Sequence, residues 1–241
     1  MAGANAGLKA TEKKQLILDR ADAFIGVLID DLITKGISEP YRMFTSRSEY
    51  RLSVRPENAD LRLTQVAHEH GLVEDGRIKC LQATLSQLTH TKAVLESIAL
   101  TPHEWISLGI KASEDGVRRT GLEMLARSDI DPKILFSKFP SLSAISQNIL
   151  DRAAIQAFYE PILQDQKKEI EAYRRDNELC LPEDLDYTAL GFLSAEVRER
   201  LGKVRPTSLA SLKRLEGITP DAIIRLLQFV RSNGDYGMSE V

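Results

Sequence analysis

From Asp60 onward, apolar residues recur at three- to four-residue spacing, the pattern of helices with one buried face. The pattern continues to about residue 99 and returns over residues 151–177, where Pro161 is expected to kink the helix or divide it in two. Between these regions, prolines and glycines interrupt the apolar clusters of residues 100–150, which favours small helices joined by loops. The sequence therefore predicts a mainly α fold.

The N-terminal region follows different patterns. Residues 1–10 are rich in Gly and Ala and predict a helix that is able to approach another backbone closely, although a tightly packed helix is the more ordinary interpretation. Residues 24–29 and 50–54 are short apolar runs among the turn residues Gly36, Pro40 and Pro56, and they predict strands. We therefore expect a small β-containing region near the N-terminus.

Capping signals are clearest in the last part of the chain. Ser194 is a candidate N-cap, Pro206-Thr207 is expected to start a second helix that Gly217 ends, and Thr219-Pro220 is expected to begin a third. Residues 233–241 are expected to form a frayed tail. The predicted division is therefore into residues 1–64, 65–150, 151–232 and 233–241.

Composition excludes several classes of protein. The 241 residues are 43% hydrophobic and 28% charged, as in soluble globular proteins, and a net charge of −3 argues against a basic shell over the whole surface. Apolar runs fall short of the roughly 18 residues that a membrane span needs. Cys80 and Cys180 are far apart and suggest neither a disulfide framework nor a metal site. Acid pairs such as Asp30-Asp31 are expected to be loop or capping charges.

The densest group of chemically useful side chains lies in residues 39–55, where arginines alternate with aromatic residues. The arginines are Arg42, Arg47, Arg51 and Arg55. Arginine binds phosphate through a planar fork and stacks on bases or flavin-like rings, so an RNA or nucleotide surface is chemically sensible. Nearby acids could instead pair with these arginines in a structural network: Glu39, Glu49, Glu57 and Asp60. The residues alone leave both alternatives open.

A second candidate surface lies in residues 209–223, which resemble a helix-hairpin-helix. Its turn could direct backbone N–H groups at a nucleic-acid phosphate, with Lys213 and Arg214 adding charge. Residues 192–231 hold eight basic and four acidic residues, so this stretch, which includes Lys203 and Arg205, is locally +4. Thr219-Pro220 replaces a glycine that would admit a phosphate, so an ordinary turn of a helical bundle remains an equal alternative.

A family resemblance is carried by the run Glu39-Pro40-Tyr41-Arg42-Met43-Phe44-Thr45-Ser46-Arg47, followed by Glu49-Tyr50-Arg51-Leu52 and Asn58-Ala59-Asp60-Leu61-Arg62-Leu63-Thr64. These residues closely resemble the signature of the MnmG (GidA) tRNA uridine-modifying flavoproteins. Residues 1–6 resemble the last helix of that family's FAD domain, and residues 184–187 and 217–223 resemble its C-terminal helical domain. Residues 55–60 and 181–187 are more similar to mitochondrial than to bacterial members, which predicts a mitochondrial location.

The resemblance implies part of an FAD- and NADH-dependent homodimer that works with an MnmE-type GTPase on C5 of the tRNA wobble uridine. It implies a C-terminal helical domain that engages tRNA and the GTPase, preceded by a remnant of the FAD-binding domain in residues 1–64. Candidate cofactor contacts in that remnant are Gly3 and Asn5. Candidate RNA contacts are Arg42, Arg47, Arg51, Arg55, Lys203, Arg205, Lys213 and Arg214.

The chain departs from the family in its catalytic parts. It contains no GxGxxG dinucleotide loop, and Cys80 and Cys180 do not match the positions of the family's functional cysteines. We therefore expect that a chain of this extent neither retains FAD on its own nor catalyses. The alternative is a non-catalytic helical module, a truncated paralogue that binds RNA or protein, and flavin absorption distinguishes it from a catalytic form.

Overall fold

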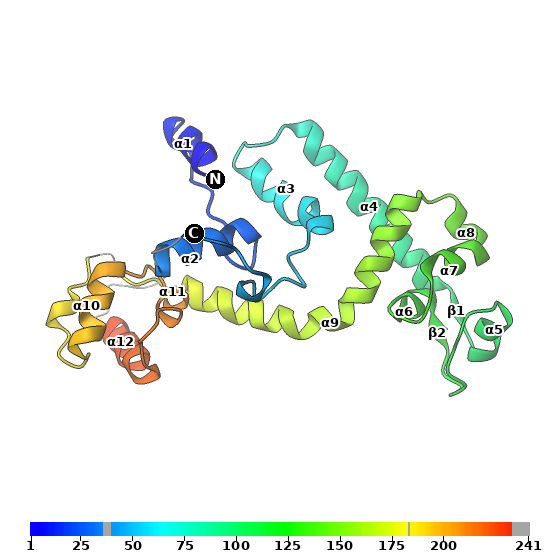
Figure 1. Ribbon diagram of the computed structural model, residues 1–241. Helices are drawn as coiled ribbons and strands as arrows, with labels where there is room; N and C mark the ends of the chain where they lie inside the picture. The colour runs from blue at the N-terminus through cyan, green and yellow to red at the C-terminus, as the bar shows by residue number, and fades with distance from the viewer. Residues whose placement is uncertain (36–39, 183, 233–241) are drawn as a thin grey trace. The chain divides into compact units, whose positions relative to one another are not determined.

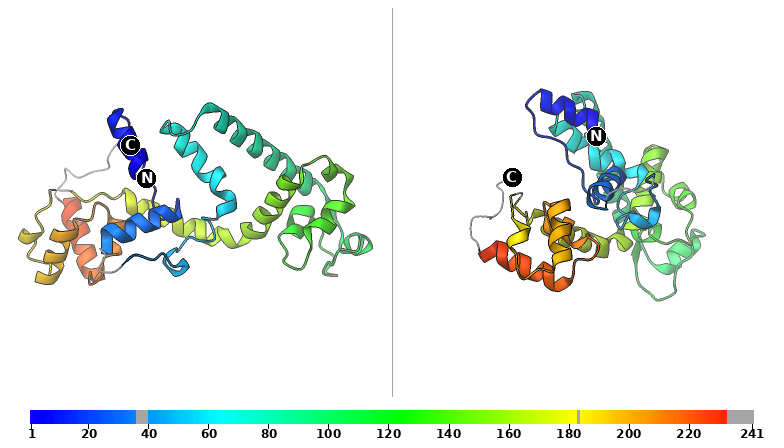
Figure 2. Two further views of the ribbon diagram at one scale, coloured as in Figure 1. Left: turned by 45° about the horizontal axis from the view of Figure 1, so that its top comes forward. Right: turned by 60° about the vertical axis from the view of Figure 1, so that its left-hand side comes forward.

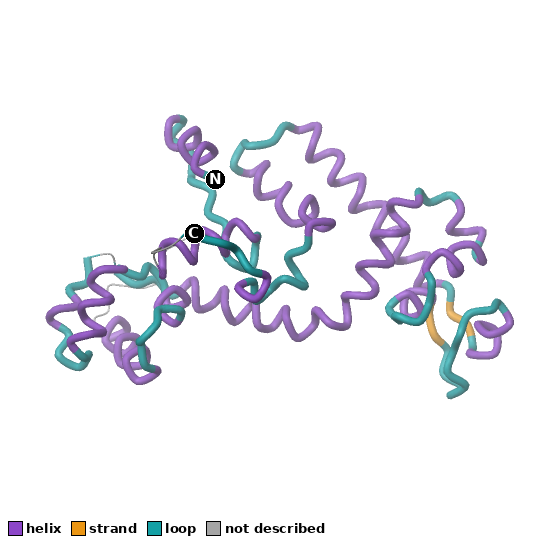
Figure 3. The backbone as a smooth tube through the Cα atoms, in the orientation of Figure 1, coloured by secondary structure: helices purple, strands orange, loops and turns teal. Residues whose placement is uncertain are grey.

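The computed structural model describes residues 1–35, 40–182 and 184–232, and the chain divides into two compact units. Unit 1 comprises Met1–Ile17 and Leu52–Asp165, and unit 2 comprises Leu18–Arg51 and the chain from Gln166 onward. Most of the described residues are helical (Figure 3), which confirms the predicted mainly α fold. Within these residues, no helix is both long enough and apolar enough to cross a membrane.

Unit 1 is built around two long helices and a cluster of short elements. Its elements are α1 (Ala2–Ala10), η2 (Pro56–Asn58), α3 (Ala59–Glu69), α4 (Asp75–Ser97), β1 (Ala99–Leu100), α5 (Pro102–Ser107), β2 (Arg119–Thr120), α6 (Gly121–Leu125), α7 (Pro132–Lys138), α8 (Pro140–Ser143) and the first part of α9 (Gln147–Glu178). Figures 1 and 2 show the short elements gathered where α4 ends and α9 begins. They enclose a core centred on the fully buried Trp105 and Met124.

The short elements of unit 1 confirm the prediction of small helices joined by loops over residues 100–150. Thr101 caps α5 through a capping box with Glu104, and Thr120 caps α6 in the same way with Glu123. The strands that lead into these two caps, β1 and β2, pair antiparallel with Ala99 opposite Thr120. The indole nitrogen of Trp105 donates to the Arg119 carbonyl at 3.1 Å, which ties α5 to β2.

Unit 2 combines an N-terminal segment with the C-terminal helices. Its elements are α2 (Phe24–Lys35), η1 (Thr45–Arg47), the last part of α9, η3 (Tyr187–Ala189), α10 (Ala195–Val204), α11 (Leu209–Lys213) and α12 (Pro220–Ser232). Leu201, Leu212 and Leu226, one from each of the last three helices, are almost fully buried in its core. In Figures 1 and 2 these three helices lie beside the C-terminal end of α9.

Two of the predicted helix starts in unit 2 are confirmed, whereas α11 ends at Lys213 and not at the predicted Gly217. The Ser194 hydroxyl accepts from the Val197 amide at 3.3 Å and caps α10, and α12 begins at Pro220. The helix α11 starts at Leu209, later than predicted from Pro206-Thr207, because Ser208 supplies the capping hydroxyl. Pro161 lies inside α9 without dividing it in two.

The predicted N-terminal strands are wrong. Residues 24–29 belong to α2, whose buried residues Val27, Asp31 and Thr34 recur at helical spacing. A short apolar run does not by itself distinguish a strand from a buried helix. Residues 50–54 form turns in which side chains satisfy the backbone, since Arg55 donates to the Leu52 carbonyl and Asn58 to the Ser53 carbonyl. In the described part of the chain, the named strands are β1 and β2 of unit 1.

Candidate nucleic-acid interface

A buried arginine organises the segment of unit 2 that carries the arginine-aromatic pattern. The side chain of Arg20 is only 4% exposed, and its Nε and Nη2 atoms donate to the Glu49 carboxylate at 3.0–3.1 Å. Its Nη1 atom donates to Asp31 at 2.8 Å and to Asp30 at 3.0 Å, and Nη2 also donates to the Arg47 carbonyl at 2.6 Å. Arg20 therefore joins α2 to η1 and the residues that follow it.

Asp31 is the acidic centre of this network. Its side chain is 1% exposed and accepts from Arg20 at 2.8 Å, from Arg47 at 3.1 Å and from the Tyr41 hydroxyl at 3.0 Å. Burial alone would raise the pKa of Asp31, but these hydrogen bonds outweigh it and hold the pKa below the ordinary value. Asp31 is thus a buried, ionised partner, and the expectation that it is a loop or capping charge is wrong.

The network extends to α9 and α11 through Arg214. The guanidinium of Arg214 donates to Asp30 at 2.5 Å and lies 5.5 Å from the ring centre of Tyr173. Tyr173 also contacts Tyr50, with 5.8 Å between ring centres, and burial raises the pKa of Tyr173 to about 12. Three arginines and three acids, namely Arg20, Arg47, Arg214, Asp30, Asp31 and Glu49, therefore neutralise one another within unit 2.

The arginines of the patterned segment occupy different environments. Arg42 and Arg51 are exposed, and neither forms an ion pair with a described residue; Arg42 lies over the Phe44 ring at 5.1 Å. Arg47 pairs with Asp31, as in a structural network, but its side chain is 39% exposed and could also contact a ligand. Glu39, at the start of the segment, lies outside the described residues.

Arg55 lies in unit 1 and is enclosed by its neighbours. It pairs with Glu57, donates to the Leu52 carbonyl and stacks over the Tyr159 ring at 4.2 Å. These contacts match the structural alternative that the nearby acids offered for this arginine. Asp60, another of those acids, pairs instead with Arg152 of α9 at 2.7 and 3.0 Å.

The basic residues of the hairpin region also differ in how they are held. Lys213 pairs with Asp176 of α9 at 2.7 Å, and Lys203 pairs with Glu199 at 2.6 Å on the exposed side of α10. Arg205 is exposed and follows α10 in the left-handed conformation, with φ of 46°. The turn between α11 and α12 uses Gly217, whose φ of 78° favours glycine. The prediction of RNA contacts at these residues has no direct test in the structure.

The candidate cofactor residues Gly3 and Asn5 lie on α1. The Asn5 amide donates to the Leu16 carbonyl at 2.9 Å, and its oxygen accepts from the Leu16 amide at 2.8 Å, so both ends fix the local backbone. A Cβ added at Gly3 or Gly7 would meet no described atom within 4 Å, so these glycines mark no close approach in the described chain. Contact with FAD at Gly3 and Asn5 therefore stays a prediction, and we derive no chemistry through it.

Sequence reasoning missed Arg20, the centre of the network. Its partners lie 7 to 29 positions away, beyond the spacing at which a helix or turn pattern reveals a contact. The clearest available signal was the Asp30-Asp31 pair within an apolar run, because a charge in such a run needs a partner when the run is buried.

Comparison with known proteins identifies related chains. Residues 75–167 match the family model of the tRNA modifying enzyme MnmG/GidA C-terminal helical domain, and residues 169–239 match that of the C-terminal helical bundle. The tRNA uridine 5-carboxymethylaminomethyl modification enzymes MnmG of Bacillus velezensis and Granulibacter bethesdensis are 38% and 39% identical over 95% and 96% of this chain. The structure of Aquifex aeolicus GidA in its form II crystal aligns with a TM-score of 0.81 and 32% identity, over 95% of this chain and 36% of that one.

These relatives correct the predicted location and confirm the predicted family. The predicted mitochondrial location is wrong, because the MnmG relatives that the chain resembles at 37–39% identity are proteins of bacteria such as Bacillus and Granulibacter. The chain spans 37% of the length of the curated relatives, in the region of their C-terminal helical domains. On the two matching C-terminal models, the shared fold and the identity over nearly all of its length, the chain belongs to the MnmG/GidA family of tRNA-modifying enzymes.

Proposed function

We propose that this chain binds tRNA as the C-terminal helical part of an enzyme that modifies the wobble uridine. The relatives are named tRNA uridine 5-carboxymethylaminomethyl modification enzymes, so C5 of a uridine is the proposed target. FAD and NADH would supply the redox chemistry from elsewhere in a homodimeric enzyme, and an MnmE-type GTPase would be the protein partner of the helical region. The role of this chain's own residues is then to hold the RNA.

The neutralised network of unit 2 is the observation that carries this proposal. Because the six charges around Arg20 cancel, the segment that they fix presents the exposed guanidinium groups of Arg42 and Arg51 without an opposing described acid. On a fixed backbone only the freedom of the side chain is lost when a guanidinium binds phosphate, and arginine forms a bidentate contact with phosphate oxygens. Arg42 and Arg51 are therefore the leading RNA contacts, and Lys203 and Arg205 are secondary ones.

Binding of the full chain to tRNA, measured against salt concentration, tests the proposal. Replacing both arginines in Arg42→Gln/Arg51→Gln should weaken binding about ten-fold at low salt and lower the slope of log K against log salt by about 1.5, as expected for two phosphate contacts. The matched control Arg77→Gln/Lys79→Gln removes the same charge from exposed positions of α4 and should bind like the unmodified chain.

Two results would count against the proposal. Absence of salt-dependent tRNA binding by the unmodified chain would refute the RNA-binding role itself. Binding that falls equally in the two double variants would show that only net charge matters, which would remove Arg42 and Arg51 as specific contacts. Thermal unfolding of each variant should match that of the unmodified chain, since all four side chains are exposed.

A further inference from the structure

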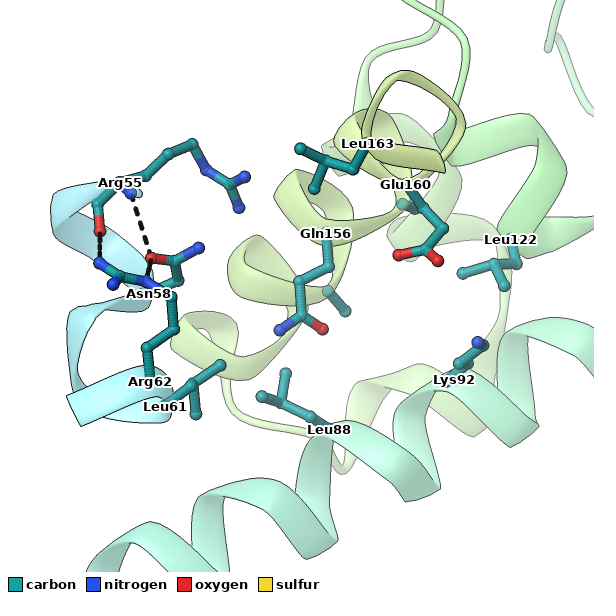
Figure 4. A pocket seen from close by; sticks show the side chains of 12 residues that line it. Arg55, Asn58, Leu61, Arg62, Leu88, Lys92, Leu122, Gln156, Glu160 and Leu163 are labelled. Carbon is teal, nitrogen blue, oxygen red and sulfur yellow. Dashed lines mark hydrogen bonds between the residues drawn. The ribbon is translucent and has the colours of Figure 1, made fainter. Parts of the chain in front are cut away.

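A pocket in unit 1 combines a buried apolar side with cationic side chains (Figure 4). Its volume is about 350 Å³, and its lining comes from η2, α3, α4, α6 and α9. Leu88 is buried in the core and Leu61 packs against that core, so these two residues form the apolar floor. Pockets of this size and character accept small organic ligands.

Lys92 is the cation of the lining that is most available to an anionic ligand. Arg55, Arg62 and Lys92 line the pocket together with one acid, Glu160, but Arg55 is already neutralised by Glu57. The Lys92 ammonium is 4.0 Å from Glu96, a long ion pair, and the Lys92 side chain is 59% exposed. Because such an exposed pair contributes little, the ammonium remains able to bind a further anion at small cost.

Two of the polar side chains in the lining, Arg62 and Arg55, are held in place by neighbouring residues. Arg62 Nε donates to the Asn58 side chain at 2.7 Å, and the Arg55 guanidinium stacks on the Tyr159 ring. Gln156 extends from α9 into the space between that helix and α4 (Figure 4). Its amide offers both donors and an acceptor, which is the combination that pairs with the edge of a nucleobase.

We propose that this pocket binds a nucleoside monophosphate, with the base on the floor of Leu61 and Leu88 beside the Gln156 amide and the phosphate at Lys92. An apolar floor alone would accept any hydrophobic group, and cations alone would accept any anion. The two together with an amide select a flat polar ring that carries a phosphate. The nucleotide is either an unstacked residue of tRNA, in which case the inference rests on the proposed function, or a free mononucleotide.

Ligand-observed NMR titration of the full chain with UMP and AMP tests the pocket directly. Ribose 5-phosphate, which lacks the base, should bind about ten-fold more weakly because it leaves the floor uncovered. Lys92→Gln should weaken UMP binding about five-fold, and Gln156→Glu about ten-fold because it places a carboxylate in the pocket. Lys79→Gln, on the exposed surface of the same helix and outside the lining, is the matched control and should bind UMP normally.

Measuring tRNA binding of the same variants separates the two sources of nucleotide. Saturable UMP binding that both pocket variants weaken, with unchanged tRNA affinity, supports a free mononucleotide. Weaker tRNA binding by Gln156→Glu, but not by Lys79→Gln, supports a tRNA residue. Absence of saturable UMP binding together with unchanged tRNA affinity in both pocket variants would overturn the pocket. If the unmodified chain does not bind tRNA, the proposed function fails, and the UMP titration alone decides the pocket.

Discussion

Replacing Asp31 with asparagine tests whether the buried ion-pair network stabilises unit 2. One oxygen of Asp31 accepts from Arg20 at 2.8 Å, and the other accepts from Arg47 at 3.1 Å and Tyr41 at 3.0 Å. Asparagine has only one side-chain oxygen, so its NH₂ group replaces the other carboxylate oxygen and faces the groups that donate to it. The Tyr41 hydroxyl can rotate to accept, but a guanidinium has no acceptor. At about 1.5–3 kcal/mol for a hydrogen bond to a charged group, one lost and one weakened bond predict a destabilisation of about 2–3 kcal/mol.

The destabilisation by Asp31→Asn should depend on pH in a definite direction. Because the folded pKa of Asp31 lies below its ordinary value of 3.8, the carboxylate stabilises the fold fully above that value and loses the contribution as pH falls through the folded pKa. The difference between Asp31→Asn and the unmodified chain should therefore be constant from about pH 5 to 7 and shrink below about pH 4.

Urea unfolding followed by amide hydrogen exchange in α2 measures this effect, and Trp105 fluorescence reports separately on unit 1. With a typical urea dependence of about 2 kcal/mol per molar, the midpoint for unit 2 should fall by about 1 M. Asp221→Asn breaks an exposed ion pair with Arg225 and, as the control, should cost less than about 0.5 kcal/mol. A loss for Asp31→Asn no larger than that for Asp221→Asn, or one that persists undiminished at pH 3, would refute the reasoning.

Two further predictions concern the backbone of unit 2. A Cβ at Gly26 would overlap the Asp19 carbonyl, so Gly26→Ala should lower the free energy of unfolding by at least about 3 kcal/mol, whereas Gly202→Ala on α10 meets no described atom within 4 Å and should change it by less than about 1 kcal/mol. Equal melting temperatures for these two variants would contradict the predicted contact. Ser194→Ala removes the cap of α10 and should cost about 1 kcal/mol, seen as faster hydrogen exchange in its first turn; unchanged exchange there would show that the hydroxyl is not needed.

Local signals in the sequence were sufficient for most helices. Ser194 and Thr219-Pro220 predict helix starts, because a capping hydroxyl and the backbone amide that it accepts from lie three residues apart. The long apolar periods of α4 and α9 likewise repeat within one or two turns. The residue run around Arg42 to Arg51 was sufficient for the family, which the two C-terminal family models then confirmed.

The candidate site depended on contacts that no local pattern contains. Arg214 meets Asp30 across 184 positions, and Arg20 meets Glu49 across 29, so sequence spacing could not reveal which arginines are neutralised and which are exposed. The apolar run of residues 24–29 was compatible with a strand or a helix. In the structure it is part of the helix α2, and Asp31 of that helix is buried against Arg20. By itself the sequence determined the helical class, several helix starts and the family, because those depend on neighbouring residues. The tertiary structure alone decided which charges cancel, because pairing and burial depend on segments that are distant in the chain.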